Sequence, residues 1–155
     1  MVKRLSFGAT LAVLVAVSAS VASARTSYSD RFVGTEILPI SSTLGTFLGV
    51  ARGQLPGQWR VQITHQPLAS GPIVAITGGT FTMRTLDRRR LAGTVTGGSV
   101  AVVNRGSRCT NQTYTVDAIS TVAHFLGTLT HHRRPVLGRC VIYAATISGS
   151  TTLNG

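Results

Sequence analysis

The segment Gln58-Trp59-Arg60-Val61-Gln62-Ile63-Thr64-His65 decides the fold class, because bulky and polar side chains alternate along it. Successive side chains of an extended chain point to opposite faces. One face therefore collects Trp59, Val61, Ile63 and His65, and the other collects Gln58, Arg60, Gln62 and Thr64. This alternation is typical of an antiparallel strand that has one face in the core and one in water.

The same two-residue period recurs along the rest of the chain. In residues 113–118, Tyr114, Val116 and Ala118 alternate with polar side chains. β-Branched or Thr-rich segments predict further strands at 33–40, 44–51, 73–83, 91–96, 99–104, 122–130 and 139–148. Gly and Pro mark turns at 52–57, 66–72, 104–107 and 133–135. No apolar run with a helical period is long enough to predict a helix.

These segments predict one all-β domain of about eight strands, with turns at intervals near ten residues. We expect a small antiparallel β-barrel, with a two-sheet β-sandwich as the alternative. A repeated Gly-Thr-apolar triplet favours the barrel, because strand glycines allow a coiled sheet to bend. The triplets begin at Gly45, Gly79, Gly93 and Gly127. Gly97-Gly98 forms either a hairpin turn or a bulge within one long strand.

The stretch Gly78-Gly79-Thr80-Phe81 resembles part of the plant dirigent and allene oxide cyclase barrels. The resemblance is short, includes no catalytic position and identifies no family. Separately from this resemblance, the alternative function is a barrel with an apolar interior that binds a small hydrophobic ligand, with activity of the cyclase or isomerase type. Inward faces around Trp59, Phe81, Tyr114 and Tyr143 would line such an interior.

The amino terminus predicts a secretory signal peptide over residues 1–24. Lys3 and Arg4 precede an apolar run at 11–17, and Ala22-Ser23-Ala24 is a small-residue cleavage site. The run is too short to span a membrane, and no second apolar stretch follows it. We therefore expect a secreted or cell-envelope protein without a transmembrane segment. Its single domain would cover 25–155, with residues 25–31 flexible.

Charge and cysteine content fit an exported basic protein. The chain has a formal net charge of +11, and loss of Lys3 and Arg4 with the signal peptide would leave +9. Every basic residue after the predicted cleavage site is arginine, which grips phosphate and carboxylate groups in a bidentate manner. In an oxidising compartment, the isolated pair Cys109 and Cys140 predicts one disulfide.

The arginines gather in clusters, and the predicted disulfide would join two of them. Arg105 and Arg108 lie beside Cys109, and the other cluster lies beside Cys140 and consists of His131, His132, Arg133, Arg134 and Arg139. We expect this end of the domain to bind a polyanion, such as an anionic surface polymer or lipid headgroups. Binding would strengthen at low salt and below about pH 6.5. The competing interpretation is a set of solvated charges that only maintain solubility. A separate cluster contains Arg84, Arg88, Arg89 and Arg90.

The sequence favours binding over catalysis. No spacing of the four histidines gives a metal-ligand pair on one strand, and we expect neither metal nor cofactor. Glu36 and Asp117 are the one carboxylate pair available for acid–base chemistry. We expect no nucleic-acid partner, because no aromatic stacking platform accompanies the arginines. Asn111-Gln112-Thr113 fits a glycosylation sequon, which we interpret as a chance match.

Overall fold

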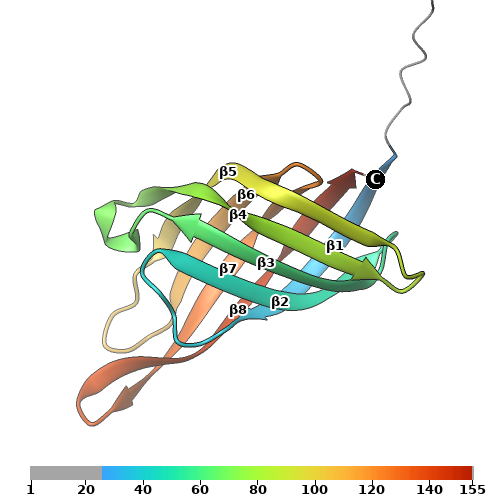
Figure 1. Cartoon of the computed structure of the whole chain (residues 1–155). Helices are drawn as coiled ribbons and strands as arrows, with labels where there is room; N and C mark the ends of the chain where they lie inside the picture. The colour runs from blue at the N-terminus through green and yellow to red at the C-terminus, as the bar shows by residue number, and fades with distance from the viewer. Residues whose placement is uncertain (1–25, 155) are drawn as a thin grey trace, which may run out of the picture.

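The structure is a computed structural model that describes residues 26–154, and it is a closed barrel of antiparallel strands (Figure 1). Neighbours in sequence pair throughout, and the last strand closes the barrel on the first. The predicted barrel and its disulfide are therefore confirmed, and the sandwich alternative is excluded. The strands are β1 (Ser27–Glu36), β2 (Leu44–Gly53), β3 (Gly57–His65), β4 (Ile73–Thr85), β5 (Arg90–Asn104), β6 (Gln112–Ser120), β7 (Ala123–Val136) and β8 (Arg139–Asn154). The predicted signal peptide lies outside the described residues.

Alternating side chains fill the barrel with an aromatic and aliphatic core. The Trp59 ring stacks on Phe32 with 5.2 Å between ring centroids, and Phe32 stacks in turn on Phe81 at 6.2 Å. Side chains of the opposite parity on β3, such as Gln58 and Arg60, are exposed. The alternation read from residues 58–65 thus separates core from solvent as expected.

Two strand glycines, Gly79 and Gly98, lie where the backbone has a positive φ and the neighbouring strand is very close. Gly97-Gly98 does not form a hairpin turn but lies at a register shift within one long β5. Gly98 has a φ of +125°, and a Cβ on it would collide with the carbonyl oxygen of Asp117. Gly79 has a φ of +146° and approaches the Gln62 carbonyl in the same way. Only glycine tolerates this combination of positive φ and close strand contact.

Three expectations about the strand ends are wrong. Residues 27–31 are not loose, because β1 begins at Ser27 and pairs with both β2 and β8. The Asp30 carboxylate of this strand is buried and accepts the Leu55 N–H at 3.0 and 3.1 Å from its two oxygens. At its other end, β1 stops at Glu36 instead of continuing to residue 40. Residues 133–135 belong to β7 rather than to a turn.

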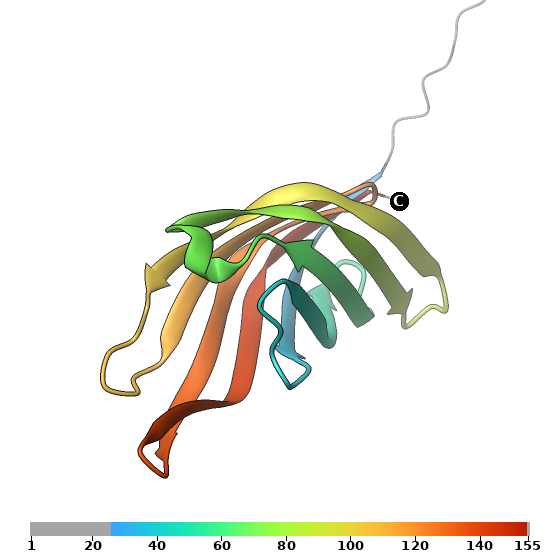
Figure 2. The same cartoon turned by 60° about the vertical axis from the view of Figure 1, so that its left-hand side comes forward.

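One end of the barrel carries both cysteines. The loop between β5 and β6 (residues 105–111) and the tip of the β7–β8 hairpin (residues 133–140) project there together (Figures 1 and 2). We call this the disulfide end.

One short 3-10 turn, Leu68–Ser70, lies between β3 and β4. Within residues 26–154, no helix is long and apolar enough to cross a membrane.

Candidate functional site

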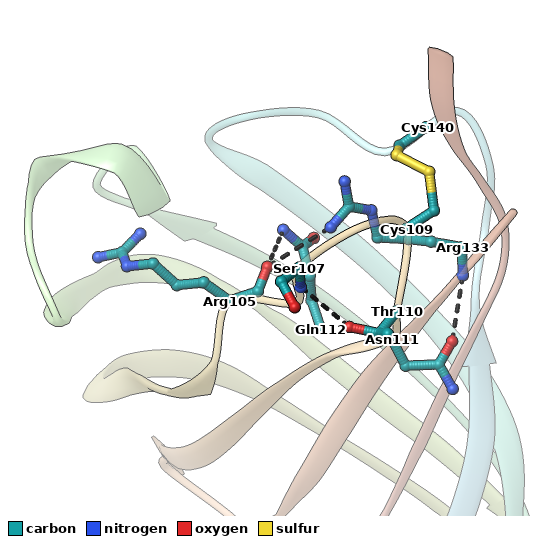
Figure 3. The surroundings of a disulfide bond; sticks show 8 residues. All are labelled: Arg105, Ser107, Cys109, Thr110, Asn111, Gln112, Arg133 and Cys140. Atoms are coloured by element: carbon teal, nitrogen blue, oxygen red, sulfur yellow. Dashed lines mark hydrogen bonds between the residues drawn. A yellow bond between two sulfur atoms is a disulfide. The ribbon is translucent and has the colours of Figure 1, made fainter. Parts of the chain in front are cut away.

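The disulfide fastens the β5–β6 loop to the β7–β8 hairpin. Cys109 in the loop bonds to Cys140 at the start of β8, with 5.3 Å between their Cα atoms (Figure 3). This bond brings together the two arginine clusters that the sequence separates by some thirty residues. Arg105 and Arg108 are on the loop side, and Arg133, Arg134 and Arg139 are on the hairpin side.

Hydrogen bonds hold the loop in place beside the disulfide. The backbone carbonyl of Arg105 accepts the Gln112 side-chain amide at 2.9 Å and the Arg133 guanidinium at 3.5 Å (Figure 3). The Asn111 side-chain oxygen accepts the backbone N–H of Arg133 at 3.2 Å. Arg133 of the hairpin is therefore bonded to the loop at Arg105 and at Asn111, which lie on either side of Cys109 in the sequence. A surface fixed in this way loses less conformational freedom when a ligand binds.

The five arginines of this end have different surroundings. The Arg105 side chain points away from the disulfide (Figure 3). It donates to the Gly71 carbonyl at 3.3 Å. The Arg134 guanidinium lies over the Tyr143 ring, 5.2 Å from its centroid. Arg108 and Arg139 are exposed to solvent. Of the arginines that the structure describes, Arg89 at the far end alone forms an ion pair with a carboxylate.

His131 is not part of this surface, contrary to our expectation. Its side chain faces the barrel interior, where its ring Nε2 lies 3.1 Å from Oε2 of Glu36. The two side chains are 3% and 4% exposed, so neither can contact an anion in solvent. His132 is the remaining histidine of the predicted site. Its ring nitrogens contact Thr146 Oγ1 at 3.0 Å and the Asn111 side-chain nitrogen at 3.4 Å.

Tyr114 packs against the buried pair of Glu36 and His131. The Tyr114 ring lies 5.1 Å from the His131 ring, and its hydroxyl donates to Gln112 Oε1 at 3.2 Å. Burial raises the pKa of Tyr114 above its usual value near 10.0. The charges of Arg105 and Arg133 oppose this rise, and the Glu36 carboxylate adds to it. A cavity of about 20 Å³ adjoins this group, which leaves no room for a substrate beside it.

The two carboxylates considered for acid–base chemistry do not face each other. Glu36 points into the barrel, whereas Asp117 is on the outside and contacts His124 Nε2 at 2.9 Å. The predicted acid–base pair is therefore not assembled. Within the part of the chain that the structure describes, no three His, Cys, Asp or Glu side chains group in a way that could hold a metal ion.

The interior cavity is small. It measures about 40 Å³ and lies among apolar side chains that include Phe32, Trp59 and Phe125. Pockets for small molecules usually measure about 300 Å³ or more. Trp59 Nε1 and Thr151 Oγ1 are buried here without a hydrogen-bond partner among the described residues. A space of this size is too small for an ordinary hydrophobic ligand.

Sequence reasoning missed two features of this region. Tyr143 is on the outside of the hairpin and 48% exposed, not in the interior as expected. It lies under Arg134 and 6.2 Å from the His132 ring, so an aromatic side chain does accompany the arginines. The contact between Glu36 and His131 joins residues 95 positions apart, and no local pattern indicates it.

No protein-family model, curated protein or solved structure matches this chain.

Proposed function

We propose that this chain is an exported, non-catalytic β-barrel that binds an anionic polymer of the cell surface through its disulfide end. The observation that carries the proposal is the joining of two arginine clusters by the Cys109–Cys140 bond. Arg108, Arg133, Arg134 and Arg139 then lie at one projecting end of the barrel, and the Arg105 side chain extends from the same loop towards Gly71. Arginine forms paired hydrogen bonds with sulfate, phosphate and carboxylate groups, which are the charged groups of such polymers.

The arginines of the disulfide end have no carboxylate partner among the described residues. The acidic residues that the structure describes are engaged elsewhere. Asp30 binds the Leu55 amide, Asp87 binds Arg89, Asp117 contacts His124 and Glu36 is buried against His131. The arginines of the disulfide end are therefore not neutralised by neighbouring carboxylates, and their field extends into solvent.

The alternative of a hydrophobic ligand inside the barrel has no comparable support. Its premise was an apolar interior with room for a small molecule, whereas the interior cavity is about 40 Å³. We therefore do not propose cyclase or isomerase activity.

Heparin chromatography over a salt series tests the proposal, with the paired variant Arg108→Gln/Arg139→Gln. A matched control, Arg31→Gln/Arg52→Gln, removes the same charge from strands β1 and β2. The site variant should lower the slope of log affinity against log salt by about one for each arginine removed. The control should weaken retention less. Equal effects of the two variants would show that only net charge matters and would overturn the proposed site.

A further inference from the structure

A groove of about 840 Å³ crosses the outer face of the barrel over β2, β3 and β4, away from the disulfide end. Outward side chains of three neighbouring strands line it, and the β4–β5 hairpin closes one side. These side chains are Leu48, Val50, Gln58, Arg60, Thr82, Arg84, Arg88 and Arg90. The groove therefore combines an aliphatic wall with a wall of four arginines.

The arginine wall is a strong positive site. Arg84 and Arg90 are directly opposite each other on β4 and β5, and Arg60 follows on the next strand. None of the four forms an ion pair with a carboxylate in residues 26–154. Asp87 in the same hairpin is already engaged. A hydrogen bond from Thr85, and then contacts with Arg89, lower the pKa of this carboxyl.

The aliphatic wall belongs to a continuous exposed stripe. Val33 on β1 is directly opposite Val50 on β2, and Leu48 follows two residues along β2. Their exposed fractions are 37%, 40% and 44%. On the other side of the barrel, Leu126 is 53% exposed but lies between Asp117 and Ser150 of the neighbouring strands. At the groove, this aliphatic stripe lies directly beside arginines that form no ion pair within the described part of the chain, because Leu48 is opposite Arg60.

We infer that this groove binds an anionic phospholipid, with the phosphate on the arginine wall and an acyl chain along Leu48 and Val50. An arginine cluster suits a phosphate because guanidinium groups donate paired hydrogen bonds to its oxygens. An aliphatic chain suits the opposite wall because it removes exposed Leu and Val surface from water. A simple anion would leave the stripe exposed, and a neutral apolar ligand would leave the arginines without partners. This inference does not depend on the disulfide end.

Methyl NMR of the wild-type protein tests the inference directly. The probe is dihexanoyl phosphatidylglycerol below its micelle concentration. Dihexanoyl phosphatidylcholine shares the chains without the net charge, and glycerol 3-phosphate shares the charge without the chains. We expect the Leu48 and Val50 methyl signals to shift with phosphatidylglycerol, and at least tenfold weaker binding of the other two probes. The Leu126 methyl signals should stay in place.

Variants test whether the arginine wall and the aliphatic wall each contribute to binding. Arg60→Gln/Arg84→Gln and Leu48→Ser should each weaken phosphatidylglycerol binding at least tenfold. Leu126→Ser is the matched control for the aliphatic wall and should bind normally. Arg108→Gln/Arg139→Gln should also bind this lipid normally, so failure of the groove and failure of the proposed polymer site are distinguishable. Equal binding of glycerol 3-phosphate, or equal shifts at Leu126, would overturn the inference.

Discussion

His131 Nε2 lies 3.1 Å from Glu36 Oε2 inside the barrel, with both side chains almost fully buried. This contact ties β1 to β7, which are not neighbours in the sheet. Buried polar groups are stable in a core only when they have partners, and removal of one partner leaves the other without compensation. The pair therefore stabilises the barrel interior near the disulfide end and is not part of the binding surface.

The first prediction concerns this pair. Glu36→Ala and His131→Ala should each lower the free energy of unfolding by about 3 kcal/mol, because each leaves a buried polar partner unmatched. The double variant should lose clearly less than the sum of the two single losses. Urea denaturation of the four proteins in the mutant cycle measures the coupling. Additive losses would mean that the two side chains do not interact.

Alkaline pH should destabilise the barrel through Tyr114. Burial raises the pKa of this phenol above its unfolded value near 10.0, so the folded chain holds the proton more tightly. Its stabilising contribution is fully present below the unfolded pKa and is lost as pH rises through the folded pKa. The unfolding free energy should therefore fall above pH 10 in the wild type. It should fall less steeply in Tyr114→Phe, and parallel pH profiles of the two proteins would contradict this origin.

Two adjacent glycines provide a matched test of the closed sheet. Gly98→Ala places a Cβ against the Asp117 carbonyl at a φ of +125°, and it should cost about 1–3 kcal/mol of stability. Gly97→Ala meets no atom within 4 Å and should change stability by less than about 0.5 kcal/mol. Thermal or urea unfolding measures both. Similar costs at the two positions would contradict the bulge that the structure places here.

The disulfide should influence both stability and binding. Cys109→Ser/Cys140→Ser removes a crosslink across a separation of 31 residues, and by chain entropy this should cost about 3–4 kcal/mol. It also frees the β5–β6 loop from the hairpin without changing the net charge. We expect weaker heparin retention from the folded variant at the same salt concentration. Unchanged retention would show that the arginines act without the geometry that the disulfide imposes.

The two-residue period predicted the barrel because burial in an antiparallel sheet follows that period directly. The same parity contains a signal for His131, which falls on the face of Ala123, Phe125 and Leu129. Its assignment to the surface was wrong because proximity to arginines in sequence outweighed that parity.

Other errors have no local signal. Tyr143 has the parity of Ala145, but a register shift opposite residues 132 and 133 of β7 places it outside. Residues 133–136 form part of β7 despite Pro135. Beyond His131, β7 pairs with β8 on one side only. Its other side is a free strand edge, where proline is tolerated. The outer groove also escaped prediction, because its walls come from strands whose register the sequence does not specify.

Amide NMR mapping of a short heparin oligosaccharide on the wild-type protein tests the central claim most directly. We predict that the largest shifts fall in the loop of residues 105–111 and in the hairpin tip of residues 133–140, and that added salt reverses them. Shifts concentrated around Arg60 and Arg84, or spread evenly over all exposed arginines, would contradict a polymer site at the disulfide end.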